Sequence, residues 1–208
     1  MLGDVTIIQL GVVFGSILIA MSTHEAMHAF TAHWLGDDTA HQAGRLTLNP
    51  LKHIDFLTTV LLPVILIALQ LPPFFVAKPV PFNPWRVRYH EFGAALIGLA
   101  GPLTNLVLAC VAALGLRLSS LDPSTAFYGV MMIFIFVNVA LFVFNMIPFP
   151  PLDGSRVLYA LVPESIQKLM QRVESMGLGA IFVFMFLLFP FLSPLVITVN
   201  RFILNILI

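Results

Sequence analysis

The residues best suited to chemistry are the two histidines and the glutamate of His24-Glu25-Ala26-Met27-His28. Histidines four residues apart lie on one face of a helix, so both imidazoles can reach one metal ion while Glu25 lies beside it. Zinc favours such ligands in a tetrahedron with one position left for water, and a nearby carboxylate can take a proton from that water. This HExxH spacing therefore predicts a zinc site. The alternative is a pair of histidines that only make hydrogen bonds. The motif is continuous with a long apolar run of the kind that spans a bilayer, and ionisable groups in or beside a bilayer are costly and usually functional.

Two histidines leave a third protein ligand to be found. Asp153 closes an uncharged run in Pro148-Phe-Pro-Pro-Leu-Asp153-Gly154, where prolines end a span and the glycine permits an unusual turn. On local pattern, Asp153 is equally well explained as the N-cap of the helix that follows. His33 is five residues past His28, a rotation of about 140°, so we expect it to point elsewhere. The full set of candidates is His33, His41, His53, His90, Glu91, Asp55 and Asp153.

Composition indicates that these residues belong to a membrane protein. Of 208 residues, 59% are hydrophobic and 10% are charged, whereas an ordinary globular domain is about 25% charged. Ten basic and ten acidic residues give zero formal net charge, and no basic stripe indicates nucleic acid as a partner. The single cysteine, Cys110, excludes a disulfide framework within one chain.

Long uncharged stretches show how the chain is divided. A membrane-spanning helix needs roughly 20 apolar residues, and five stretches of 19 to 30 uncharged residues lie at 5–23, 56–77, 92–116, 123–152 and 175–200. We therefore predict an all-α integral membrane protein, a polytopic bundle of about four to six transmembrane helices. It forms a single membrane-embedded domain over 1–208, with a core at 5–160 and C-terminal helices at 175–208. The first run lacks a basic leader and a cleavage site, so we expect it to be a retained span. The last stretch contains prolines and fits one bent span or two short ones.

Three motifs in one order resemble the site-2 protease family, the intramembrane zinc metalloproteases of peptidase family M50. They are HEAMH in an apolar helix, Gly101-Pro-Leu-Thr-Asn105, and Asn145-Met-Ile-Pro148 running into Leu152-Asp153-Gly154. The segments 49–53 and 77–84 resemble connectors of the short prokaryotic branch, which lacks PDZ and CBS domains.

The resemblance implies a zinc metalloendopeptidase that cuts in or near transmembrane segments. It implies His24, His28 and Asp153 as ligands of one zinc ion, and Glu25 as the catalytic acid/base. It suggests that Asn105 and Asn145 hold substrate or the oxyanion, although Asn105 also lies on a small-residue helix face suited to packing. Regulated intramembrane proteolysis of a transmembrane protein or peptide, in a prokaryotic inner membrane, is the implied setting. One alternative is a membrane transporter of metal ions or protons, which inverted repeats would favour, and the sequence has none. The other is an inactive relative that binds membrane segments without cutting them.

The segment 56–77 decides on which side of the membrane Asp153 lies. If the segment crosses the membrane, Asp153 and the end of the HExxH helix lie on opposite sides. Three of nine basic residues then lie on one side of the membrane and six on the other. If the segment instead enters the membrane and leaves on the same side, eight of these basic residues share one side and only Arg117 lies on the other. The positive-inside rule favours re-entry and an active site toward the cytoplasm. We expect a re-entrant loop near the active site, with β-like Val76–Val80 offering an edge to an unwound substrate; a proline-kinked span is the alternative.

Overall fold

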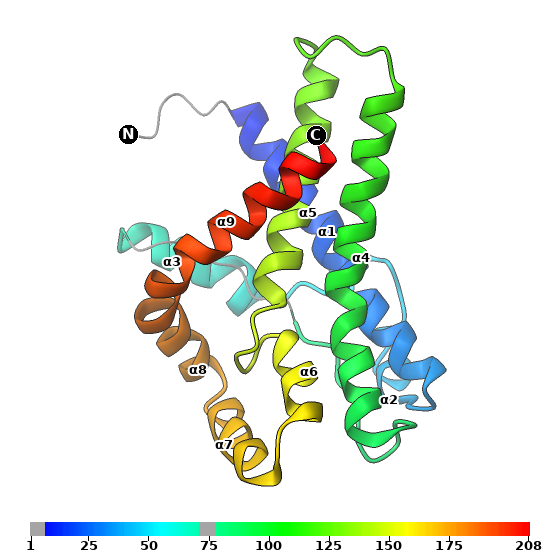
Figure 1. Ribbon diagram of the computed structural model, residues 1–208, viewed down its shortest axis with the longest axis vertical. Helices are drawn as coiled ribbons and strands as arrows, with labels where there is room; N and C mark the ends of the chain where they lie inside the picture. Colours follow the sequence, from blue (N-terminus) through cyan, green and yellow to red (C-terminus); the bar gives the residue numbers. More distant parts are fainter. Residues whose placement is uncertain (1–6, 71–77) are drawn as a thin grey trace.

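The structure, a computed structural model, describes residues 7–70 and 78–208 and is built from helices (Figure 1). No strand occurs in these two ranges. Four helices are long and apolar enough to cross a membrane: α1 (Ile7–Trp34), α4 (His90–Leu118), α5 (Ala126–Asn145) and the continuous stretch Leu178–Leu207. The prediction of an all-α polytopic membrane protein is confirmed.

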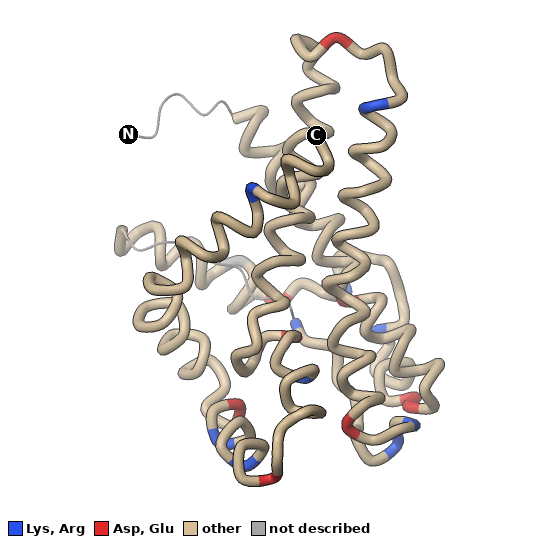
Figure 2. Tube along the Cα trace, viewed as in Figure 1, with Lys and Arg blue, Asp and Glu red and all other residues tan. Residues whose placement is uncertain are grey.

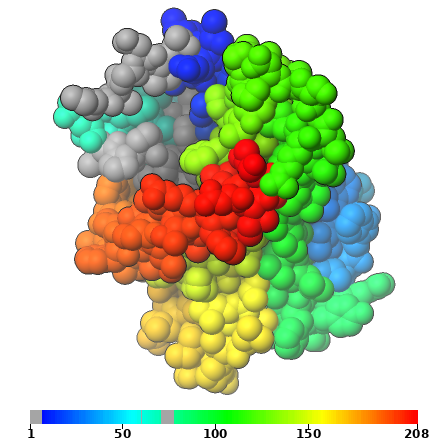
Figure 3. All heavy atoms as spheres, turned by 45° about the horizontal axis from the view of Figure 1, so that its top comes forward, coloured from blue at the N-terminus to red at the C-terminus, as the bar shows by residue number. Residues whose placement is uncertain are grey.

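The last stretch is one bent helix. It consists of α8 (Leu178–Val183), a π-helical segment η3 (Phe184–Leu188) and α9 (Phe189–Leu207). A π-helical turn and a proline are both common causes of a sharp helix bend, and here Pro190 lies just after the π segment. In the space-filling view, α9 lies across the face of the bundle formed by α4 and α5 (Figure 3).

Shorter helices occupy the connections. Between α1 and α4 lie α2 (Thr39–Gln42), the 3-10 turn η1 (Pro50–Lys52), the π-helical η2 (Phe56–Leu61) and α3 (Leu62–Ala68). Between α5 and α8 lie α6 (Gly154–Leu161) and the amphipathic α7 (Glu164–Ser175). Asp55 begins η2 because its carboxylate accepts hydrogen bonds from the main-chain N–H groups of Leu57 and Thr58.

The helix α4 is the centre of the bundle and contacts α1, α5, α6 and α9. Its contact with α5 is built from small residues against larger ones, which lets the two backbones approach closely. The buried residues of this core are Ala109, Ala112 and Ala113 on α4 and Ile135, Val139 and Val143 on α5. Large apolar side chains instead cover the outer faces, as expected for a surface in contact with lipid.

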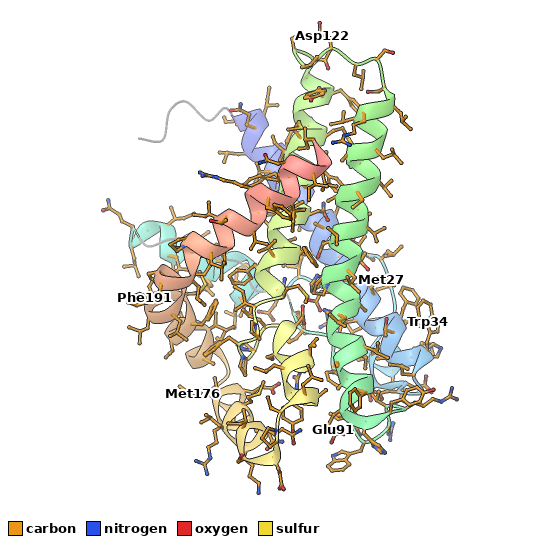
Figure 4. The ribbon with its side chains drawn as sticks, in the orientation of Figure 1. Met27, Trp34, Glu91, Asp122, Met176 and Phe191 are labelled. Atoms are coloured by element: carbon orange, nitrogen blue, oxygen red, sulfur yellow. The ribbon has the colours of Figure 1, made fainter. Side chains whose placement is uncertain are left out.

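The segment between α1 and α4 returns to the end of the bundle that it left. Trp34 at the end of α1 and Glu91 at the start of α4 lie toward the lower end, whereas Asp122 lies at the upper end (Figures 1 and 4). The six residues of η2 and the seven of α3 make a helix too short to cross. This arrangement agrees with re-entry. Residues 71–77 lie outside the described residues, as does part of the predicted edge Val76–Val80.

The charged residues are also distributed unevenly between the two ends of the bundle. Most charged residues lie toward the lower end, near the end of α1, the start of α4 and along α6 and α7, and few lie at the upper end (Figure 2). Arg117, in the last turn of α4, donates a hydrogen bond to the carbonyl oxygen of Ile206 at 2.8 Å and so joins α4 to the end of α9. The excess of charge at one end of the bundle agrees with the uneven division of basic residues expected from the sequence.

Candidate metal centre and its cavity

Two buried imidazoles on α1 form the base of the site. His24 and His28 are 6% and 7% exposed, and their Nε2 atoms lie 3.0 Å apart. The helix continues through the HExxH residues to Trp34, so the spacing of one turn is preserved. Gly36, with φ +98°, follows the helix end in a conformation that favours glycine.

Asp153 supplies the third group from a distant part of the chain. Its Oδ2 atom lies 3.0 Å from His24 Nε2 and 3.4 Å from His28 Nε2. Although Asp153 precedes α6, its side chain makes no capping hydrogen bond to that helix, so the N-cap alternative does not describe its side chain. Gly154 allows a close approach to the α5–α6 connector and not the unusual turn expected from the sequence, because its φ is not positive and a Cβ there would lie 2.4 Å from the carbonyl oxygen of Met146.

The hydrogen bonds on the far side of each ring fix where the lone pairs point. His28 Nδ1 donates to the carbonyl oxygen of Ile97 at 2.6 Å, and a carbonyl oxygen can only accept. His24 Nδ1 donates to Asn105 Oδ1 at 2.6 Å. In the neutral form of each imidazole, Nε2 therefore carries the lone pair that a metal ion binds, and both Nε2 atoms lie within 3.4 Å of Asp153 Oδ2. Three converging acceptors are the arrangement that a divalent cation stabilises.

The spacing of these groups fits zinc. Tetrahedral zinc with bonds of 2.0–2.1 Å holds its ligand atoms about 3.3 Å apart, close to the 3.0, 3.0 and 3.4 Å between the three groups. A Cβ on Gly101 would lie 2.4 Å from His28 Nε2 and 2.6 Å from His24 Nε2. The absent side chain of Gly101 thus lets α4 pack directly against both imidazoles. In the described part of the chain this is the one cluster of three such groups close enough to share an ion.

A cavity of about 730 Å³ opens beside the cluster. Its walls come from α1, the start of η2, the end of α5, the α5–α6 connector and the bent last helix, and they are mostly apolar. Glu25, half-buried on α1, faces this cavity together with His24 and Asp153. Asn145 also lines it, and its Nδ2 donates to the carbonyl oxygen of Leu141 at 3.1 Å.

The other candidate ligands lie elsewhere. His33 pairs with Asp38 at 2.6 Å in an exposed position, as its angle on the helix predicted. His53 is buried, and its Nε2 lies 2.8 Å from the carbonyl oxygen of Thr47. Asp55 caps η2 at the cavity edge, and the main-chain N–H of Thr58 holds its pKa below the usual value, so it stays charged at neutral pH. His41, His90 and Glu91 are exposed, apart from the cluster.

Known proteins resemble this chain over most of its length. The chain is 36% identical over 188 residues to "Putative zinc metalloprotease YwhC" of Bacillus subtilis (strain 168), a match that covers 86% of this chain and 80% of that protein. The chain belongs to peptidase family M50, the site-2 protease family. The model of Peptidase family M50 matches residues 120–188, which include Asp153.

A second M50 relative is more distant. "Putative zinc metalloprotease Rip2" of Mycolicibacterium smegmatis is 34% identical over 161 residues, covering 77% of this chain and 61% of that protein. No solved structure matches the chain. The comparisons confirm the predicted family and the predicted class of enzyme, a zinc metalloprotease.

In this M50 peptidase, a chain of amides supports His24 from behind. Asn105 is fully buried, and its Nδ2 donates to Asn138 Oδ1 at 2.9 Å and to the carbonyl oxygen of Ala20 at 3.1 Å. Asn138, also fully buried, donates in turn to the carbonyl oxygen of Phe134. Since the amide of Asn105 is fully engaged, this geometry favours orienting His24 over contacting substrate. Asn138 was missed from the sequence, where an amide inside an apolar span was its only signal.

We expect Asn105→Leu to weaken zinc binding by about 10- to 100-fold, because the ring of His24 loses the acceptor that fixes its orientation. Competition with a chromogenic chelator measures the zinc dissociation constant, and circular dichroism reports whether the helices persist. Thr104→Val, which removes a hydroxyl bonded only to the carbonyl oxygen of Ala100, is the matched control on the same helix. Unchanged zinc affinity in Asn105→Leu would contradict the positioning role.

Proposed function

We propose that this chain is an intramembrane zinc metalloendopeptidase that hydrolyses peptide bonds in or near transmembrane segments of membrane proteins. The observation that carries the proposal is the opening of one apolar cavity, bounded by spanning helices, onto His24, Glu25 and Asp153. An apolar cavity reached between spanning helices suits an apolar membrane segment, because ligand pockets match the polarity of their occupant.

His24, His28 and Asp153 would hold a single zinc ion. When bound there, zinc acts as a Lewis acid that acidifies water and polarises a peptide carbonyl. Glu25 then accepts the proton of the attacking water and passes it to the leaving nitrogen as the peptide bond breaks. The apolar cavity walls restrict water to the vicinity of these polar groups, which strengthens their electrostatic interactions.

The substrate segment must lose its helical hydrogen bonds locally before it is cut, because a helix shields its peptide bonds. Asn145, which lines the cavity, is one amide placed to contact the exposed main chain or the oxyanion. The concentration of basic residues at the lower end of the bundle, toward which α1 runs from the site to Trp34, supports a cytoplasmic orientation of that end (Figures 2 and 4). The bacterial relatives support a prokaryotic cell membrane as the location.

The proposal is tested with the purified chain in proteoliposomes containing a reporter transmembrane segment. We expect about one zinc per chain, loss of cleavage on chelation, and recovery when zinc is restored. His24→Ala and Asp153→Ala should lose both zinc and cleavage, since each removes a ligand. Asp122→Ala, an acidic residue in the loop at the opposite end of the bundle (Figure 4), should keep both. Wild-type protein that moves zinc across the bilayer without cutting the reporter would instead indicate a transporter.

A further inference from the structure

A single amide on the last helix faces the active-site cavity. Asn200 lies on α9 four residues after Val196 and four before Leu204, so the three share one face of the helix. Val196 and Leu204 pack against the core of α4 and α5, which fixes this as the inward face. Figure 3 shows α9 lying across that core. Asn200 and Val196 also line the cavity that holds His24, Glu25 and Asp153.

The amide of Asn200 is only half satisfied. Its Nδ2 donates to the carbonyl oxygen of Val196 at 2.9 Å, which fixes the orientation of the amide because a carbonyl oxygen cannot donate. Its Oδ1 is buried and has no hydrogen-bond partner. Only one other side-chain atom in the described part of the chain, His53 Nδ1, shares that condition. A buried acceptor without a donor is unfavourable, and more so in an apolar setting, so it marks a place where a donor is expected.

The donor that fits is a main-chain N–H. An apolar segment that unwinds in a bilayer exposes N–H groups that have no water to bind, and every such group needs an acceptor. Oδ1 can only accept, so it complements an N–H group and not a carbonyl. The position of Asn200 on α9 places this acceptor on a different wall of the cavity from the α1 residues His24 and Glu25.

We propose that Asn200 Oδ1 accepts a hydrogen bond from a main-chain N–H of the unwound substrate segment and so holds that segment in the cavity. The inference rests on the proposed function, because it takes the occupant to be a membrane segment undergoing hydrolysis. Asn200 is then a substrate-binding residue contributed by the last helix, far in sequence from the metal ligands.

The test measures binding and cleavage separately. In a Glu25→Gln background, binding of a synthetic apolar reporter segment to reconstituted protein is measured with and without Asn200→Leu. We expect Asn200→Leu to weaken binding about five- to tenfold, the size of one hydrogen bond. In the active protein it should raise KM by a similar factor and change kcat by less than about twofold. Zinc content should be unchanged. Thr198→Val, whose exposed hydroxyl bonds only to the carbonyl oxygen of Pro194, is the matched control and should behave as wild type.

A second measurement changes the reporter instead of the protein. Replacing single amide bonds of the reporter by esters removes one N–H donor at a time. One ester position should weaken binding about five- to tenfold when Asn200 is present, and by less than about twofold in the Asn200→Leu protein. The proposal would be overturned if each ester weakened binding equally in the wild-type and Asn200→Leu proteins, or if the two proteins bound the reporter with equal affinity. Either result would assign Oδ1 to bound water.

The outcomes separate this inference from the proposed function. If the wild type binds the reporter and zinc but cuts nothing, the proposed function fails. An ester position that weakens binding only when Asn200 is present would still support the hydrogen bond. If cleavage occurs with no coupling to Asn200, the proposed function stands and the inference fails.

Discussion

Gly101→Ala is expected to weaken zinc binding by at least about 100-fold and to abolish cleavage while the bundle stays folded. The added Cβ would lie 2.4 Å from His28 Nε2 and 2.6 Å from His24 Nε2, well inside contact distance. The two rings have little freedom to move away. They are hydrogen-bonded to Ile97 and Asn105, which lie four residues before and four after Gly101 on the same face of α4. The methyl group therefore displaces either the ligands or the ion.

Zinc content per chain and the zinc dissociation constant measure this effect directly. Gly115→Ala is the matched control, since it makes the same substitution on the same helix and its Cβ has no neighbour within 4 Å. Because alanine favours helix over glycine by up to about 1 kcal/mol, neither variant should lose helical structure through propensity. Wild-type zinc affinity in Gly101→Ala would show that the close approach of α4 to the imidazoles does not shape the site.

Glu25→Gln is expected to retain zinc and to reduce the cleavage rate by about 100- to 10,000-fold. Glutamine has nearly the same shape as glutamate but cannot accept a proton from water. Zinc should persist because Glu25 is not part of the cluster formed by His24, His28 and Asp153. The variant thus separates proton transfer from metal binding, which His24→Ala cannot do.

Single-turnover cleavage of the reporter segment, with zinc quantified on the same preparation, provides the measurement. Glu91→Gln makes the identical change at an exposed position in the first turn of α4 and should leave both quantities unchanged. A Glu25→Gln protein that cuts the reporter at the wild-type rate would refute the assignment of Glu25 as the acid/base.

Local periodicity explains why part of the site could be predicted from the sequence. The four-residue spacing of His24 and His28 places both on one helix face in any continuous helix, and α1 is continuous there. The apolar runs gave five candidate spans by their length, and four of them correspond to helices long enough to cross a bilayer. The separation of basic residues predicted that the segment after α1 returns to its own side, which agrees with the positions of Trp34 and Glu91 (Figure 4).

The remaining features depend on contacts between residues far apart in the chain. The sequence by itself determined a membrane-embedded bundle, an HExxH helix and seven candidates for a third ligand. Only the tertiary structure brought Asp153, the third ligand that the family resemblance implied, against the two histidines. It also joined His24 to Asn105 and Asn138, placed Gly101 against the imidazoles and turned Asn200 toward the cavity. The physical reason is that helix periodicity fixes neighbours three or four residues apart, whereas contacts between helices depend on how closely α1, α4, α5 and α9 pack.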